Sequence, residues 1–233
     1  MLRSLDNDSE VSLMNVRLAS VALLLTAAAA MAQLSNTGFD TGFVASGGQA
    51  ELPAPWSSTG PGNSFISFDT WDHTGGNGLL PTFANVFTGV TAASGTRWSG
   101  GWNFENMHQL MSFTLTPGQQ YTISANVHAA NPAIGFIPGG FEFGLGATST
   151  STPLVVATFP TVTWSNGWVL QSATFTAPSN AALLPYFFPI AYSSNQAVNT
   201  YVGIDDITIT PVPAPGSIAL LSSGLILTFR RRR

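Results

Sequence analysis

The sequence contains no cysteine and no lysine among its 233 residues, and only 8% of its residues are charged. Without cysteine there is no disulfide, no thiol nucleophile and no cysteine-ligated zinc, so stability must come from burial, sheet hydrogen bonds or a bound metal. Arg97 is the one basic residue, histidine apart, between Gln33 and Thr210, where eight acidic residues give a formal charge of −7. Such a stretch cannot neutralise phosphates, which argues against nucleic acid and favours divalent cations or neutral polymers as partners.

Signatures of catalysis are also scarce. The three histidines are dispersed and show no zinc-ligating spacing, and no Gly-x-Ser-x-Gly elbow is present. We therefore expect a protein that is not an enzyme. The alternative is a polysaccharide-degrading enzyme, which would need two carboxylates across a cleft. The candidates for such a pair are Glu105, Glu142 and Asp72.

The N-terminal segment has the pattern of a secretory signal peptide. Arg17 precedes an apolar run from Leu18 to Ala30, and Ala30-Met31-Ala32 supplies a small-x-small cleavage site. Acidic residues lie upstream of Met14, which is therefore the better start. We assign residues 1–32 to a leader and helical signal peptide.

The C-terminal segment, residues 211–233, joins a Pro/Gly turn to an apolar run and a terminal arginine cluster. The turn is Pro213-Ala214-Pro215-Gly216, the run extends from Ile218 to Phe229, and the cluster is Arg230, Arg231, Arg232 and Arg233. This order resembles the PEP-CTERM sorting signal of Gram-negative bacteria, with Ala214 where the family has glutamate. The resemblance implies export, transient anchoring in the inner membrane by a short helix, processing by an exosortase, and delivery to the cell surface or extracellular matrix. A buried C-terminal strand or helix is the alternative.

Between these ends, short apolar stretches alternate with Gly/Pro turns. Leu110 to Thr116 and Tyr121 to Val127 both alternate with period two around Pro117-Gly118, which predicts a β-hairpin. Further strands are expected at 86–92, 141–145, 154–159, 168–176, 183–192 and 201–210. Many short strands separated by such turns predict one all-β domain over residues 33–210, a jelly-roll-like antiparallel β-sandwich.

Three short motifs follow the order of a known family. Asn36-x-Gly38-Phe39-Asp40 opens the domain, Leu115 to Thr122 marks its middle, and Ile204-Asp205-Asp206-Ile207 closes it. This order resembles the galactose-binding-like jelly rolls that serve as carbohydrate-binding modules. The resemblance implies a β-sandwich that binds sugar.

The paired aspartates of the last strand need a partner. Successive side chains of a strand face opposite sides, so either Asp205 or Asp206 must face the packed side of the sheet. Calcium prefers carboxylate oxygens, and in the resembled modules a structural calcium ion links the first strand to the last. The resemblance thus implies Asp40 with Asp205 or Asp206 as metal ligands. The alternatives are a bulge that lets both aspartates reach water, or hydrogen bonds from backbone amides.

Aromatic residues beside glycine-rich or polar stretches are the candidate sugar site. Indole rings on loops stack on sugar rings while polar side chains bind the hydroxyl groups. The predicted ligand-binding residues are Trp71, Trp98 and Trp102, with Asp72, Asn103 and Glu105. The alternative is that these large aromatic rings fill the core of the sandwich.

Together these features predict an exported, non-catalytic surface or matrix protein that binds polysaccharide through a β-sandwich. A purely structural or adhesive surface protein without a sugar site is the alternative.

Overall fold

A computed structural model describes residues 34–42, 52–58, 68–72, 84–192 and 199–213. The chain divides into two compact units, residues 1–31 and residues 32–233, and every described residue belongs to the second. The predicted signal peptide and the sorting segment from Ala214 onward lie outside the described residues. Within the described ranges, no helix is long and apolar enough to cross a membrane.

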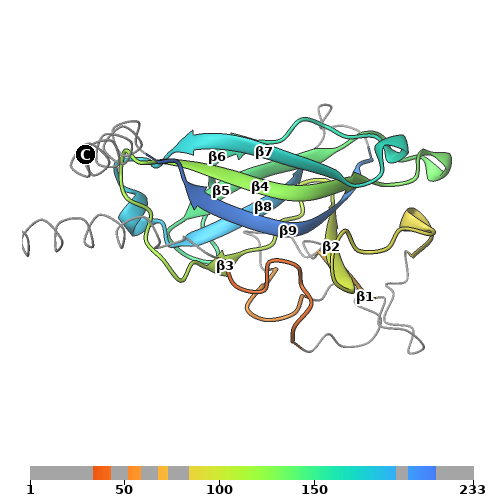
Figure 1. The fold of residues 1–233 in the computed structure, drawn as a ribbon, viewed down its shortest axis with the longest axis horizontal. Helices are drawn as coiled ribbons and strands as arrows, with labels where there is room; N and C mark the ends of the chain where they lie inside the picture. The colour runs from red at the N-terminus through yellow and green to blue at the C-terminus, as the bar shows by residue number, and fades with distance from the viewer. Residues whose placement is uncertain (1–33, 43–51, 59–67, 73–83, 193–198, 214–233) are drawn as a thin grey trace, which may run out of the picture. The chain divides into compact units, whose positions relative to one another are not determined.

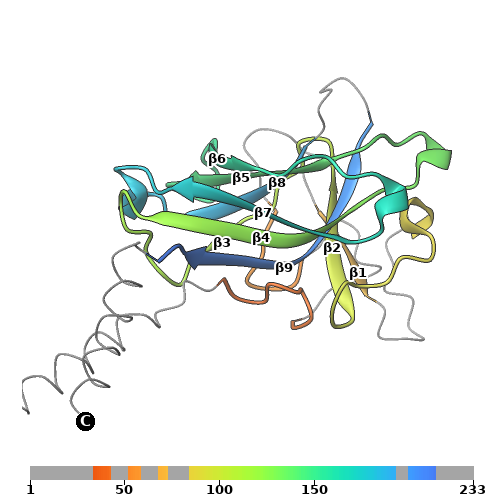
Figure 2. The same ribbon diagram turned by 45° about the horizontal axis from the view of Figure 1, so that its top comes forward.

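The strands form two antiparallel sheets (Figures 1 and 2). One sheet has five strands in the order β1-β2-β9-β4-β7 and the other has four in the order β3-β8-β5-β6. The strands are β1 (Asp69–Asp72), β2 (Arg97–Trp102), β3 (Gln109–Leu110), β4 (Gln120–Ala129), β5 (Gly140–Gly146), β6 (Leu154–Thr158), β7 (Val169–Thr176), β8 (Tyr186–Tyr192) and β9 (Tyr201–Pro211). Short 3-10 helices connect them: η2 (Ala84–Phe87), η3 (Pro132–Ile134), η4 (Trp164–Asn166) and η5 (Ala181–Leu183).

The predicted jelly-roll-like antiparallel β-sandwich is confirmed. Alternate residues of the long strands point between the sheets, as the period-two patterns require. Ile123 of β4, Ile209 of β9 and Phe143 of β5 are fully buried in this main core. Phe143 packs against the ring of Phe159 at a centroid distance of 4.6 Å.

A second hydrophobic cluster lies on the opposite face of the five-stranded sheet. Its buried members are Trp71, Val86, Phe87, Trp98, Ala130 and Tyr201. The indoles of Trp71 and Trp98 stack at 4.2 Å, and the ring of Phe87 meets both edge-on. Glycines in the sheet make room for them, because a Cβ on Gly203 would lie 2.5 Å from Trp98 Cζ3.

Two expected elements differ from the prediction. Strand β4 pairs with β7 and β9 rather than with the segment before Pro117, so the predicted hairpin is wrong. Only Leu110 of that segment lies in a strand, the two-residue β3, and Leu115 still reaches the main core. The strand expected at 86–92 is replaced by η2 and a turn, which carry Val86 and Phe87 into the second cluster.

Candidate functional site: an aromatic turn and an acidic cluster

Two of the three predicted sugar-stacking tryptophans are buried. Trp71 lies in β1 and Trp98 in β2, with 1% and 0% of their surfaces exposed. They were expected on loops, but their strands pair directly and bring the two indoles face to face. The prediction that these two rings offer a face to sugar is therefore wrong, because each covers the other and the glycines beneath them.

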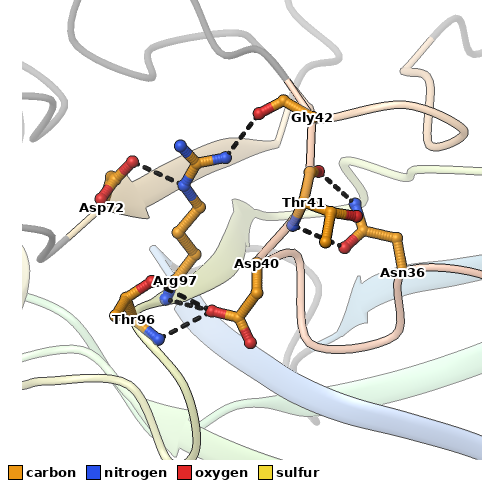
Figure 3. Close-up of polar contacts among 7 residues, drawn as sticks. All are labelled: Asn36, Asp40, Thr41, Gly42, Asp72, Thr96 and Arg97. Carbon is orange, nitrogen blue, oxygen red and sulfur yellow. Dashed lines mark hydrogen bonds and ion pairs between the residues drawn. The ribbon is translucent and has the colours of Figure 1, made fainter.

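Asp72 is also buried. Its Oδ2 accepts a hydrogen bond from Arg97 Nε at 2.5 Å in a largely buried ion pair. The guanidinium also donates from Nη1 to the carbonyl oxygen of Gly42 (Figure 3). The single basic residue of the predicted domain is thus occupied in fastening β1 to β2 and to the segment around Gly42.

The third tryptophan belongs to an exposed aromatic turn, residues 102–105. Trp102 is 45% exposed and Phe104 is 43% exposed, whereas the other five tryptophans are buried or half-buried. The turn carries the chain from β2 in one sheet toward β3 in the other. Two large rings therefore face solvent within three residues.

Hydrogen bonds hold this aromatic turn rigidly. Trp102 N donates to Glu105 Oε2 at 2.6 Å, and Glu105 N donates to the carbonyl of Trp102 at 2.7 Å. Asn103 exchanges two bonds with Thr200, donating from its backbone N and accepting at Oδ1. The backbone of Ala191 accepts from Phe104 N and donates to the carbonyl of Glu105. The predicted residues Trp102, Asn103 and Glu105 are thus brought together, with the two rings on a fixed frame.

Phe104 was not among the predicted site residues. Its φ of 60° lies in the left-handed region, which is unfavourable for an aromatic residue and common at functional sites. In sequence, Phe104 looks like any core phenylalanine, so only the position of the turn reveals it. Asn106 and His108 follow this turn, and in the described structure Asn106 Oδ1 and His108 Nδ1 are buried without a hydrogen-bond partner.

The three predicted metal ligands form an acidic cluster. Asp205 Oδ2 accepts from the backbone N of Ala93 at 3.0 Å and of Ser94 at 3.1 Å. Asp206 sits at a bulge in β9 with φ of 53°, where Oδ1 accepts from Ser94 Oγ and Oδ2 from Asn126 Nδ2. Asp40 Oδ1 accepts from the backbone N of Thr96 and Arg97 (Figure 3). The expected alternative of hydrogen bonds from backbone amides is therefore realised. The bulge is also present, but it does not let both aspartates reach water, because Asp205 is fully buried.

One carboxylate oxygen from each of the three aspartates lies beside Gly38. A Cβ on that glycine would lie 3.2 Å from Asp40 Oδ2, 3.3 Å from Asp206 Oδ1 and 3.5 Å from Asp205 Oδ1. Within the described ranges, no three His, Asp or Glu side chains are already spaced as a complete metal-binding group. Three acidic groups nevertheless share one small space that only a glycine leaves open.

Burial within this cluster changes the acidity of Asp205. Its side chain is fully buried, and burial raises its pKa to about 7, with the neighbouring charge of Asp206 adding to the effect. Amide hydrogen bonds act in the opposite direction and lower it. The guanidinium of Arg97 points to Asp72 instead, so it does not compensate the cluster.

The carboxylates considered for catalysis are held in separate ways. Asp72 forms the ion pair with Arg97, and Glu105 closes the aromatic turn. Glu142 lies on β5, where burial raises its pKa.

No protein-family model and no curated protein matches the sequence. Among solved structures, a cyclase from Fischerella sp. TAU has a TM-score of 0.47 at 14% identity, over 80% of this chain and 99% of that one. The CBM22-1 xylan-binding domain of Paenibacillus barcinonensis Xyn10C has a TM-score of 0.44 at 15% identity, over 76% and 93%. A family 61 carbohydrate-binding module in complex with β-1,4-galactotriose has a TM-score of 0.39 at 13% identity, over 77% and 97%. The similar structures are thus mostly carbohydrate-binding modules, with a cyclase among them.

Proposed function

We propose that the domain is a non-catalytic module that binds neutral polysaccharide at the aromatic turn. The observation that carries this proposal is the pair of exposed rings, Trp102 and Phe104, on a hydrogen-bonded turn with a strained residue. Exposed rings on a rigid frame lose little conformational entropy on binding and offer apolar faces to sugar rings. Asn103 Nδ2, which has no hydrogen-bond partner in the described structure, supplies a donor for a sugar hydroxyl beside them.

A neutral polymer fits better than an anionic one. The predicted domain carries a formal charge of −7, and its one arginine is bound to Asp72. An anionic polysaccharide would meet uncompensated negative charge, whereas hydroxyl groups both donate and accept hydrogen bonds.

Binding of the purified full chain to insoluble cellulose, xylan and β-1,4-galactan, with polygalacturonate as the anionic comparison, tests the proposal. We expect retention on at least one neutral polymer and loss of retention in Phe104→Gly. Glycine accepts the left-handed backbone, so this variant removes the ring without strain. Leu183→Ala, which trims a 71% exposed side chain on η5, is the matched control. Retention only on polygalacturonate, or equal retention of Phe104→Gly, contradicts the proposal.

A structural calcium ion fits the acidic cluster. Asp40, Asp205 and Asp206 would hold it through the oxygens that converge beside Gly38. Calcium prefers such oxygen ligands and would offset the repulsion among the three carboxylates. It would also fasten the segment before β1 to β9 at the end of the chain.

Export and surface delivery complete the proposed function. The motif of residues 211–233 supports recognition by an exosortase-type enzyme and transient membrane anchoring. Of the residues named for this motif, Pro213 lies within the described ranges. Fractionation of producing cells tests this. Replacing Arg230 to Arg233 with alanine should abolish processing and surface delivery, and unchanged delivery of that variant would contradict the proposal.

A further inference from the structure

Strand β7 is an edge strand of the five-stranded sheet formed by the described residues. It pairs with β4 along all eight of its residues without a register shift, and it ends the strand order β1-β2-β9-β4-β7 (Figures 1 and 2). No strand within the described ranges pairs with its other edge. Natural sheets usually keep their edge strands short, charged, bulged or covered. At eight residues, β7 is long for an edge strand.

The hydrogen-bond pattern identifies the backbone groups at that edge. Val212 of the β9 end donates to the carbonyl of Gln120, so even-numbered residues of β4 face β9 and odd-numbered ones face β7. The bond from Ala177 N to the carbonyl of Gln119 agrees with this assignment. In β7, therefore, the N–H and C=O groups that point away from β4 belong to Leu170, Ser172, Thr174 and Thr176.

The side chains of β7 provide none of the usual protection. The strand contains no charged residue, no proline and no glycine. Its four even-numbered side chains are all exposed, and Leu170 is 71% exposed. In a domain with a formal charge of −7, this edge is an uncharged place where two copies can approach without opposing like charges.

We propose that two copies of this chain associate through antiparallel pairing of their β7 strands. A twofold axis between Ser172 and Thr174 places Ser172 of each copy opposite Thr174 of the other, and Leu170 opposite Thr176. In this register only outward-facing backbone groups meet, and the four residues of each copy satisfy one another's donors and acceptors. Strand pairing with itself about a twofold axis yields a closed dimer with one continuous ten-stranded sheet rather than an open fibre.

The test measures the mass of the purified full chain by analytical ultracentrifugation over a wide concentration range. We expect a concentration-dependent dimer of the 24.4 kDa chain. Ser172→Lys places like charges on the paired edges, and Thr174→Pro removes a donor that points away from β4, so both should give monomers. Ser124→Lys adds the same charge on the neighbouring strand β4, opposite Ser172, and should leave the dimer intact.

Amide hydrogen exchange distinguishes this dimer from any other. The amides of Leu170, Ser172, Thr174 and Thr176 should gain protection with rising concentration, while those of Val169, Gln171, Ala173 and Phe175 are protected at every concentration by β4. A monomer at all concentrations overturns the proposal. So does a dimer that survives both edge variants, or a dimer in which the even-numbered amides remain unprotected.

Discussion

The buried carboxyl group of Asp205 should make stability depend on pH in an unusual direction. Its pKa is raised from 3.8 to about 7, chiefly by burial. The folded protein therefore binds the proton more tightly than the unfolded chain does. The free energy of unfolding due to this group is greatest below pH 4, falls as the pH rises toward 7, and is constant above that. Most acidic groups in proteins act in the opposite direction.

The size of the effect follows from the shift. A change of about 3 pKa units corresponds to about 4 kcal/mol of stability lost between pH 4 and pH 8, because each unit is worth about 1.4 kcal/mol. Asp205→Asn removes the titration, so the difference in unfolding free energy between wild type and variant isolates this group from His108, His128 and Glu142, whose pKa values are also shifted.

Urea unfolding of both proteins in a chelator, at several pH values, gives this difference directly. In Asp206→Asn the fall should be smaller but still present, since burial is the larger cause. With calcium added, the wild type should gain stability at pH 8 in a concentration-dependent way, and Asp205→Asn should gain much less. A difference that does not change with pH would refute the buried acid, and equal calcium responses would refute the metal site.

Four further substitutions probe the packing and the polar interior. Trp98→Ala should cost about 3–5 kcal/mol of unfolding free energy because the ring is wholly buried, whereas Trp102→Ala should cost far less; urea titration checks both. Gly203→Ala should cost about 1–3 kcal/mol in the same assay, because its Cβ would lie 2.5 Å from the ring of Trp98. Tyr201→Phe should cost about 1–2 kcal/mol, because it removes the hydroxyl that donates to the buried Asp69 Oδ2. A neutral result for Trp98→Ala would contradict the described second cluster.

The period-two pattern correctly predicted a strand where the strand buries alternate residues. Tyr121 to Val127 is such a segment, and it lies within β4 as expected. Strand β2 was not predicted, since Trp-Ser-Gly-Gly-Trp has the composition of a turn. Gly100 of β2 and Gly203 of the paired strand β9 leave room for the indole rings that lie over both of them from the same side. No local pattern reveals that distant tryptophans fill the place of missing side chains.

The acidic cluster could be predicted from the sequence, whereas the exposure of the individual aromatic rings could not. The resemblance to carbohydrate-binding modules implied Asp40 with Asp205 or Asp206, and the structure brings the carboxylates of all three together beside Gly38. Trp71 and Trp102 look alike in sequence, each beside polar residues, but only the pairing of β1 with β2 decides which ring is buried. Phe104 was missed because the sequence does not show that this residue takes a left-handed backbone conformation in an exposed turn.

The central claim is that the aromatic turn binds a neutral polysaccharide, and affinity electrophoresis of the full chain in gels containing soluble xylan or β-1,4-galactan tests it most directly. The account predicts that at least one neutral polymer retards the wild type and Leu183→Ala equally, while Trp102→Ala and Phe104→Gly migrate as in a gel without polymer. Unretarded wild type, or retardation that both ring-removing variants retain, would contradict the claim.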